Sequence, residues 1–191
     1  MKSYQAVLTI TLSLFAGLAS AQTTHRAFDI NLNDDAARAA LFLRAGNPKL
    51  LADLGWLHHQ TRGDVIHVGI HLVDEASDGK DPLQAGLGVR FVYTKPNNAL
   101  VDGGALALGG FVRYILPNAN RFNVGGYLYY APDVVSFGDV QEYYEVGARV
   151  GYNVVRDADV YLGVRSTKAD YGGPGRFSFD SGLHIGFEIR F

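Results

Sequence analysis

Apolar and polar residues alternate along most of this chain, and the alternation is clearest at its C-terminal end. There, every second position is apolar: Leu183, Ile185, Phe187, Ile189 and Phe191. Because side chains on a β-strand point to opposite faces with a period of two, these residues share one face. The pattern predicts a closing β-strand with one apolar surface and a terminal aromatic residue.

Similar runs recur between turn signals, and we interpret ten of them as strands. Their approximate spans are residues 26–33, 36–45, 49–60, 64–73, 83–95, 103–116, 121–131, 140–154, 158–169 and 178–191. A tilted strand that crosses a bilayer has about 9–11 residues, which fits these lengths. The predicted fold is an all-β, antiparallel, up-and-down transmembrane barrel of about ten strands, with eight to twelve strands also compatible.

The two faces of the predicted strands differ in chemistry. One face is apolar almost throughout, as in Ile66, Val68, Ile70 and Leu72. The other face carries glycines and a series of polar residues: Asp29, Asn31, Arg38, Arg44, Asp53, His67, His71, Arg90, Arg113, Glu145, Arg149, Arg165, Glu188 and Arg190. We expect the apolar face to contact lipid and the polar face to line the lumen, where glycines leave room for long charged side chains. A soluble lipocalin-like barrel also alternates, but it keeps its interior apolar.

Aromatic residues and loops suggest two different rims. One aromatic girdle would hold Trp56, Tyr93, Tyr130, Tyr144 and Phe179, and the other Tyr114, Phe122, Tyr152 and Phe191. With both termini in the periplasm, residues 95–102, 132–138 and 170–177 become external loops, and 46–49, 117–120 and 156–159 become short periplasmic connections. The connection formed by residues 74–82 is long, yet it falls on the periplasmic side. Either this periplasmic connection is an exception to the expected short length or the strand count is wrong by one.

The N-terminus predicts export. Residues 1–21 combine Lys2, an apolar run and a small-residue ending, which is typical of a secretory signal peptide. Residues 22–191 are expected to form a single barrel domain, with no later stretch apolar enough for a transmembrane helix. The chain has no cysteine, so neither disulfides nor thiolate chemistry are available. A formal net charge of −2 gives no indication of a nucleic-acid partner.

Catalytic and metal chemistry are weakly indicated, and we expect no enzyme activity, no cofactor and no metal. On a strand, His67 and His71 lie about 13 Å apart along the backbone, too far to share one ion. A lipid enzyme at the outer rim would have to gather residues from His58, His59, Ser136, Asp139 and Ser166, without any Gly-x-Ser-x-Gly motif.

The remaining chemistry lies in the charges predicted for the lumen. The candidate lumen-lining residues are Arg90, Arg113, Glu145, Arg149, Arg165, Glu188 and Arg190. They either line a narrow path for ions or small solutes, with an arginine-rich side selecting for anions, or pair with one another and plug it. Because barrels of about eight strands are filled by their own side chains, a filled interior is slightly favoured. A non-conducting barrel would then act through its external loops, and a soluble periplasmic ligand-binding barrel is a further alternative.

Three segments resemble the YfaZ family of small outer-membrane proteins: Gly125-Gly-Tyr-Leu-Tyr-Tyr-Ala-Pro-Asp133, Tyr143-Tyr-Glu-Val-Gly-Ala-Arg-Val-Gly-Tyr-Asn153 and Asp159-Val-Tyr-Leu-Gly-Val-Arg165. The turn Arg62-Gly-Asp-Val65 also fits, so the resemblance covers about residues 51–191.

The resemblance implies a porin-like barrel in the bacterial outer membrane, with no defined substrate and no catalytic residues. Similarity to outer-membrane barrels also implies that Phe191 is an assembly signal. The partners expected are outer-membrane lipids and, through the C-terminal strand, the barrel assembly machinery. The barrel itself is expected to be a monomer.

Overall fold

The computed structural model describes residues 23–45, 47, 49–76, 83–97 and 99–191. The predicted signal peptide, residues 1–21, lies outside the described residues. The described chain forms β-strands joined by turns, with one short 3₁₀ turn, η1 (Asp133–Val135). No helix in this part of the chain has the length and hydropathy needed to cross a membrane.

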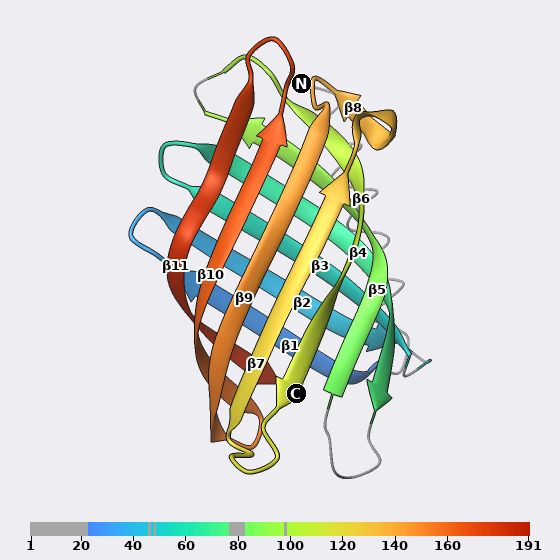
Figure 1. Ribbon diagram of the computed structural model, residues 1–191, viewed down its shortest axis with the longest axis vertical. Helices are drawn as coiled ribbons and strands as arrows, with labels where there is room; N and C mark the ends of the chain where they lie inside the picture. The colour runs from blue at the N-terminus through green and yellow to red at the C-terminus, as the bar shows by residue number, and fades with distance from the viewer. Residues whose placement is uncertain (1–22, 46, 48, 77–82, 98) are drawn as a thin grey trace.

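Ten long strands account for most of the molecule (Figure 1). They are β1 (Thr23–Leu32), β2 (Ala36–Ala45), β3 (Leu50–His59), β4 (Gly63–Ala76), β5 (Leu83–Pro96), β6 (Gly103–Ile115), β7 (Phe122–Ala131), β9 (Glu142–Val155), β10 (Ala158–Asp170) and β11 (Arg176–Arg190). Each matches one predicted span within a few residues. The sequence missed η1 and the three-residue strand β8 (Ser136–Gly138), which lie in the expected external loop 132–138.

The strands close into a barrel. Hydrogen-bonded neighbours follow the order β5-β4-β3-β2-β1-β11-β10-β9-β7-β6, and a further pairing of β5 with β6 completes the circle. β1 joins β11 antiparallel, from Ala27 opposite Arg190 to Leu32 opposite Ile185. A closed ladder leaves no sheet edge, as β-structure within lipid requires. The predicted up-and-down barrel of ten strands is therefore confirmed.

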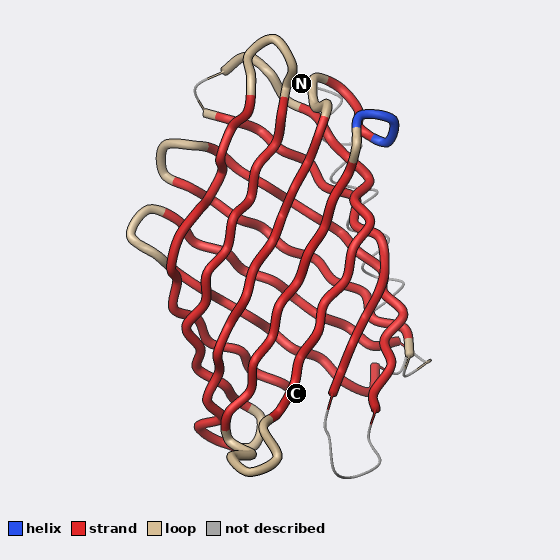
Figure 2. Tube along the Cα trace, viewed as in Figure 1, coloured by secondary structure: helices blue, strands red, loops and turns tan. Residues whose placement is uncertain are grey.

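The two ends of the barrel have different connections. The terminal rim carries the C-terminus and the turns around residues 116–121 and 156–157, whereas the loop rim carries η1, β8 and the turn around residues 171–175 (Figures 1 and 2). Since the strand count of ten holds, β4 ends and β5 begins at the terminal rim. The doubt about residues 74–82 is thus resolved in favour of the count, although residues 77–82 themselves lie outside the described residues.

The faces of the strands are those of a membrane barrel. Outward residues such as Leu87 and Leu108 are large, apolar and 75% and 69% exposed. Inward residues such as Asp29 and Glu145 are charged and each only 2% exposed. A continuous apolar exterior of this size would be unstable in water, so the predicted alternative of a soluble barrel with an apolar interior does not fit.

Inward glycines provide the space for large inward side chains. Across the hydrogen-bonded ladder, nine inward glycines among the described residues each face a large side chain that lies over them: Gly55 and His67, Gly69 and Asp53, Gly86 and Phe111, Gly88 and His71, Gly109 and Tyr129, Gly147 and Tyr127, Gly151 and Asn123, Gly163 and His184, and Gly186 and Tyr161. A Cβ atom on any of these glycines would lie within 2.7 Å of the facing residue. The glycines expected beside lumenal charges therefore have a specific packing role.

Candidate functional site

The interior of the barrel is divided into an apolar half and a polar half. Near the loop rim, buried apolar residues form one packed cluster, the apolar plug: Ala36, Leu57, Val65, Val92, Ala105, Ala107, Tyr129, Ala131, Val140, Tyr143, Ala169, Tyr171 and Phe179. Tyr143 and Phe179 are completely buried. The expectation of a polar lumen along the whole barrel is wrong for this half.

Phe179 corrects a second expectation, because it points into the barrel and not into an aromatic girdle. The register between β10 and β11 shifts at this point: Thr167 lies opposite Asp180, and the next residue, Lys168, lies opposite Ser178. Phe179 is the extra residue of a β-bulge, so Phe179 and Asp180 are consecutive yet both buried. Strict alternation cannot anticipate such a position.

Loop residues complete the plug at the loop rim. Tyr171 follows β10, and its hydroxyl lies 2.6 Å from Oγ1 of Thr94 on β5. Its ring packs edge to face on Phe177, with 5.5 Å between ring centroids. Burial raises the pKa of the Tyr171 phenol to about 12. Val140, which follows β8, is also buried in the plug.

A layer of charges lies directly below the plug, around Asp53. Arg90 Nη2 lies 2.6 Å from Asp53 Oδ2, and His67 Nε2 lies 3.0 Å from the same oxygen. His71 Nδ1 approaches the other carboxylate oxygen at 3.5 Å. The two histidines therefore meet one carboxylate despite their backbone separation, because Gly69 between them leaves room for it. No cluster of side chains suited to a metal ion occurs among the described residues.

Glu145 links the same layer to the plug. Its carboxylate lies 3.4 Å from Arg90 Nη1 and 3.7 Å from Arg38 Nη2. The Tyr143 hydroxyl donates to it at 3.1 Å. The guanidinium of Arg90 stacks on Tyr129, with 3.8 Å to the ring centroid. Two candidate lumen-lining residues, Arg90 and Glu145, are thus buried and held by several partners.

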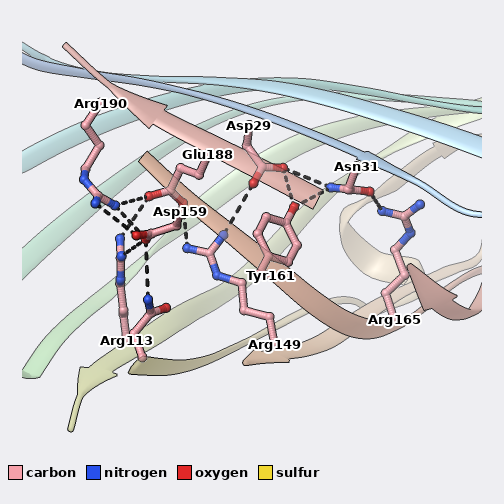
Figure 3. Close-up of polar contacts among 10 residues, drawn as sticks. Asp29, Asn31, Arg113, Arg149, Asp159, Tyr161, Arg165, Glu188 and Arg190 are labelled. Carbon is pink, nitrogen blue, oxygen red and sulfur yellow. Dashed lines mark hydrogen bonds and ion pairs between the residues drawn. The ribbon is translucent and has the colours of Figure 1, made fainter. Parts of the chain in front are cut away.

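A second cluster of charges lies nearer the terminal rim (Figure 3). Glu188 accepts hydrogen bonds from Arg113 at 2.9 Å, Arg149 at 2.6 Å and Arg190 at 2.7 Å. Asp159 pairs with Arg113 and lies 2.9 Å from Arg190 Nη1. Three arginines therefore share two carboxylates. We call Arg113, Arg149 and Arg190 the guanidinium cluster.

A chain of hydrogen bonds continues from this cluster toward the middle of the barrel. Arg149 Nη1 lies 3.4 Å from Asp29, and the Tyr161 hydroxyl donates to Asp29 at 2.9 Å. Asn31 donates to Asp29 at 2.9 Å and accepts from Arg165 (Figure 3). Arg165 also pairs with Asp180. These contacts connect strands that are far apart in the sequence.

An open cavity remains in the polar half. Its volume is about 370 Å³, and its lining includes all three residues of the guanidinium cluster together with Phe42 and Phe111. A wider recess of about 760 Å³ lies beside it at the terminal rim. The open space in the lumen therefore lies on the terminal side of the apolar plug.

The seven candidate lumen-lining residues all point into the barrel, although only some border the cavity. Arg90, Arg113, Arg149, Glu188 and Arg190 line it, while Glu145 and Arg165 are buried in the network beside it. Sequence reasoning missed Asp159, Tyr161 and Asp180. The alternation of Asp159, Tyr161, Gly163 and Arg165 contained the signal for the first two, but Asp159 was assigned to a turn.

The residues considered for a rim enzyme have unrelated partners. His58 Nδ1 lies 2.8 Å from Asp64, while His59 is buried on the opposite face. Ser136 donates to the Pro132 carbonyl at 3.0 Å. Asp139 accepts from the Asp102 backbone N–H at 3.2 Å. The partners Asp64, Pro132 and Asp102 all lie outside the set of residues considered for the rim enzyme.

Phe191 completes the seam of the barrel at the terminal rim. Its N–H donates to the Arg26 carbonyl at 2.8 Å, and its own carbonyl accepts from the Arg26 N–H at 2.9 Å. The phenyl ring is 67% exposed. The backbone of this residue therefore extends the β1–β11 pairing, while its side chain remains on the outer surface of the barrel.

Comparison with known proteins gives one family match. A family model described as YfaZ precursor matches residues 2–191, so the similarity also covers the N-terminal part that the sequence motifs left open. No curated protein matches the chain.

Solved structures resemble the chain only distantly. A structure described as the KdgM porin in complex with disordered oligogalacturonate is 11% identical, with a TM-score of 0.44, covering 88% of this chain and 99% of that one. A NanC porin structure is 10% identical, with a TM-score of 0.43, covering 86% and 98%. The outer membrane protein OpdK from Pseudomonas aeruginosa is 10% identical, with a TM-score of 0.23, covering 82% and 57%.

Proposed function

The chain belongs to the YfaZ precursor family, and on that premise we propose that it is a small monomeric barrel of the bacterial outer membrane. It is porin-like in class, but its lumen is closed to solutes in this conformation. The terminal rim faces the periplasm and the loop rim faces outward, as expected for a barrel with an even number of strands. Outer-membrane lipids cover its apolar exterior, and we expect it to catalyse no reaction.

The apolar plug is the observation that carries this proposal. Its residues come from β-strands on opposite sides of the barrel and from the segments around Val140 and Tyr171. Packed apolar side chains exclude a continuous row of water molecules, and the tyrosine hydroxyls of the plug already have partners, so an entering ion would lose its hydration without compensation. The charged layer around Asp53 and Arg90 lies next to the plug on its terminal side, and its charged groups pair with one another.

A gated narrow channel is the second candidate. It is favoured by the cavity and the recess, which already open half of the lumen toward the terminal rim. Among the described residues, the plug and the charged layer lie between this space and the loop rim. Displacement of the segments that carry Val140 and Tyr171 would shorten the closed part, so a triggered open state is compatible with the same barrel.

Planar-bilayer recording separates the two candidates. We expect the refolded wild-type chain to be silent, and the double variant Tyr143→Ala with Phe179→Ala to conduct, because it removes two completely buried rings from the plug. Arg90→Ala and Arg149→Ala should then alter the ion selectivity of the opened variant.

A change in gel migration on boiling verifies that each protein is folded. Stable conductance of the unmodified barrel would contradict the closed state and favour the channel. If the double variant does not fold, Phe179→Ala alone provides the same comparison.

A further inference from the structure

An open cavity lies between the guanidinium cluster and Phe111, and neither belongs to the apolar plug that closes the lumen. We propose that it is a binding site for a small organic anion that enters from the terminal rim. The acidic group would contact the guanidinium cluster, and the apolar part would pack against Phe42 and Phe111. The proposal requires only an assembled barrel, so it holds whether or not the lumen conducts.

The first argument is the relative burial of the paired charges. Side chains of Arg113, Arg149 and Arg190 keep 17%, 24% and 29% of their surface exposed. Their partners Asp159 and Glu188 keep only 2% and 7%. The carboxylates are therefore more deeply buried than the guanidinium groups, and of these two carboxylates only Glu188 borders the cavity.

The second argument is the supply of hydrogen-bond donors. Each guanidinium group carries five N–H bonds in a fixed plane. Arg113 and Arg149 approach the carboxylates through Nη1 and Nη2, and each of these nitrogens carries a second N–H, whereas Arg190 Nη1 already donates to both Glu188 and Asp159. Arg113 Nε is buried without a partner among the described residues. Since the buried carboxylates hold these arginines in place, a bound anion would meet a pre-organised cluster of donors.

The third argument is the charge along the route of entry. Seven arginines line the cavity, against the carboxylates of Asp29 and Glu188: Arg26, Arg38, Arg44, Arg90, Arg113, Arg149 and Arg190. The recess at the terminal rim is lined by Arg113, Arg121, Arg156 and Arg190, with no carboxylate among its described lining residues. Such a surface concentrates anions near the mouth of the cavity and repels cations.

The fourth argument concerns the rest of the ligand. Phe42, Leu51 and Phe111 provide an apolar wall within the same cavity. The Phe111 ring is held over Gly86 and against His71, with 5.8 Å between the His71 and Phe111 ring centroids. A volume of about 370 Å³ is suited to one small molecule. The combination favours a compact organic anion over an inorganic ion or a polymer.

Gly125 offers a way to fill the cavity without touching an ion pair. Unlike the packed glycines, it faces a side chain at ordinary contact distance: a Cβ atom would lie 3.7 Å from Arg149, with a closer approach of 3.1 Å to the Val112 carbonyl. Gly125 also lines the cavity. Gly125→Leu should therefore occupy the space while leaving Arg149 bound to Asp29 and Glu188.

Calorimetric titration of the folded full-length barrel in non-ionic detergent tests the proposal. The probes are phenyl phosphate, inorganic phosphate and benzyl alcohol. We expect saturable one-to-one binding of phenyl phosphate, weaker binding of inorganic phosphate and no saturable binding of the neutral alcohol. Gly125→Leu should weaken phenyl phosphate binding at least about tenfold, and binding should weaken as salt increases.

Arg190→Gln is the second variant, because Arg113 and Arg149 still pair with the carboxylates it leaves. It should also weaken binding, whereas Arg176→Gln, the same charge change on an exposed side chain at the loop rim, should leave affinity unchanged. Absence of saturable phenyl phosphate binding to the folded wild type would overturn the proposal. Equal binding by the wild type and Gly125→Leu would overturn the location, and equal affinity for both phosphates would overturn the role of the apolar wall.

Discussion

Tyr161 lies over Gly186 across the β10–β11 ladder and extends its hydroxyl to Asp29 Oδ1 at 2.9 Å. The glycine leaves room for the ring, and the tyrosine then reaches across β11 to β1, the strand on the other side of the barrel seam. The same relationship recurs at the other packed glycines. In this lumen, the position of a large polar side chain is therefore decided jointly by its own strand and by the residue opposite.

Gly186→Ala adds only one methyl group, but we expect it to destabilise the barrel strongly. The new Cβ atom would lie 2.2 Å from Cζ of Tyr161, so the ring must move and its bond to Asp29 is lost. We expect a loss of about 1–3 kcal/mol in the free energy of unfolding. Urea unfolding in lipid vesicles measures it. Gly125→Ala is the matched control, because its Cβ atom has more room, and an equal loss there would refute the packing role.

Arg90→Met should lower stability by about 3–5 kcal/mol, because it leaves the buried carboxylates of Asp53 and Glu145 without their shared cation. Arg176→Gln removes a pair on a side chain that is 56% exposed and should change stability by less than about 1 kcal/mol. Urea unfolding in lipid vesicles measures both changes in stability. A small effect of Arg90→Met would mean that the central layer does not hold the strands together.

Val89→Arg places a charge on the outward face near the middle of β5. If lipid covers this face, the substitution should destabilise the barrel by about 2–4 kcal/mol in vesicles. Leu100→Arg makes the same chemical change in a fully exposed loop residue and should have little effect. Comparable stability of Val89→Arg and wild type would argue against a membrane-facing surface at that position.

Two variants separate the possible roles of Phe191. Phe191→Ala removes the exposed ring but keeps both backbone hydrogen bonds to Arg26, whereas deletion of the residue removes all of them. If the ring is an assembly signal, both variants should insert poorly in cells, and Phe191→Ala should still refold normally in detergent. Insertion of Phe191→Ala in cells is measured by heat-modifiable migration of the outer-membrane fraction. Normal insertion would show that the side chain is not needed for assembly.

The strands, their number and their two faces follow from the sequence because they depend on local alternation. A residue such as Leu87 or Asp29 is assigned to a face by its neighbours two positions away, and closure of the barrel preserves that assignment. Membrane insertion reinforces the pattern, since an outward charge or an unpaired backbone group is costly in lipid. The same argument explains why candidates such as Arg149 and Glu188 were recognised as inward residues.

Contacts across the lumen were decided only by the tertiary structure. Asn31 and Tyr161 meet because β1 and β10 both flank β11. The stagger of these strands determines which side chains lie at the same level along the barrel axis. The bulge at Phe179 and the packing of Tyr171 into the plug depend on the same closed geometry. Alternation specifies that a side chain points inward, but it carries no information on what the side chain meets there. The sequence therefore determined the barrel and its faces, while the closed loop-rim half, the paired charges and the remaining cavity arise from the way ten staggered strands bring distant residues together.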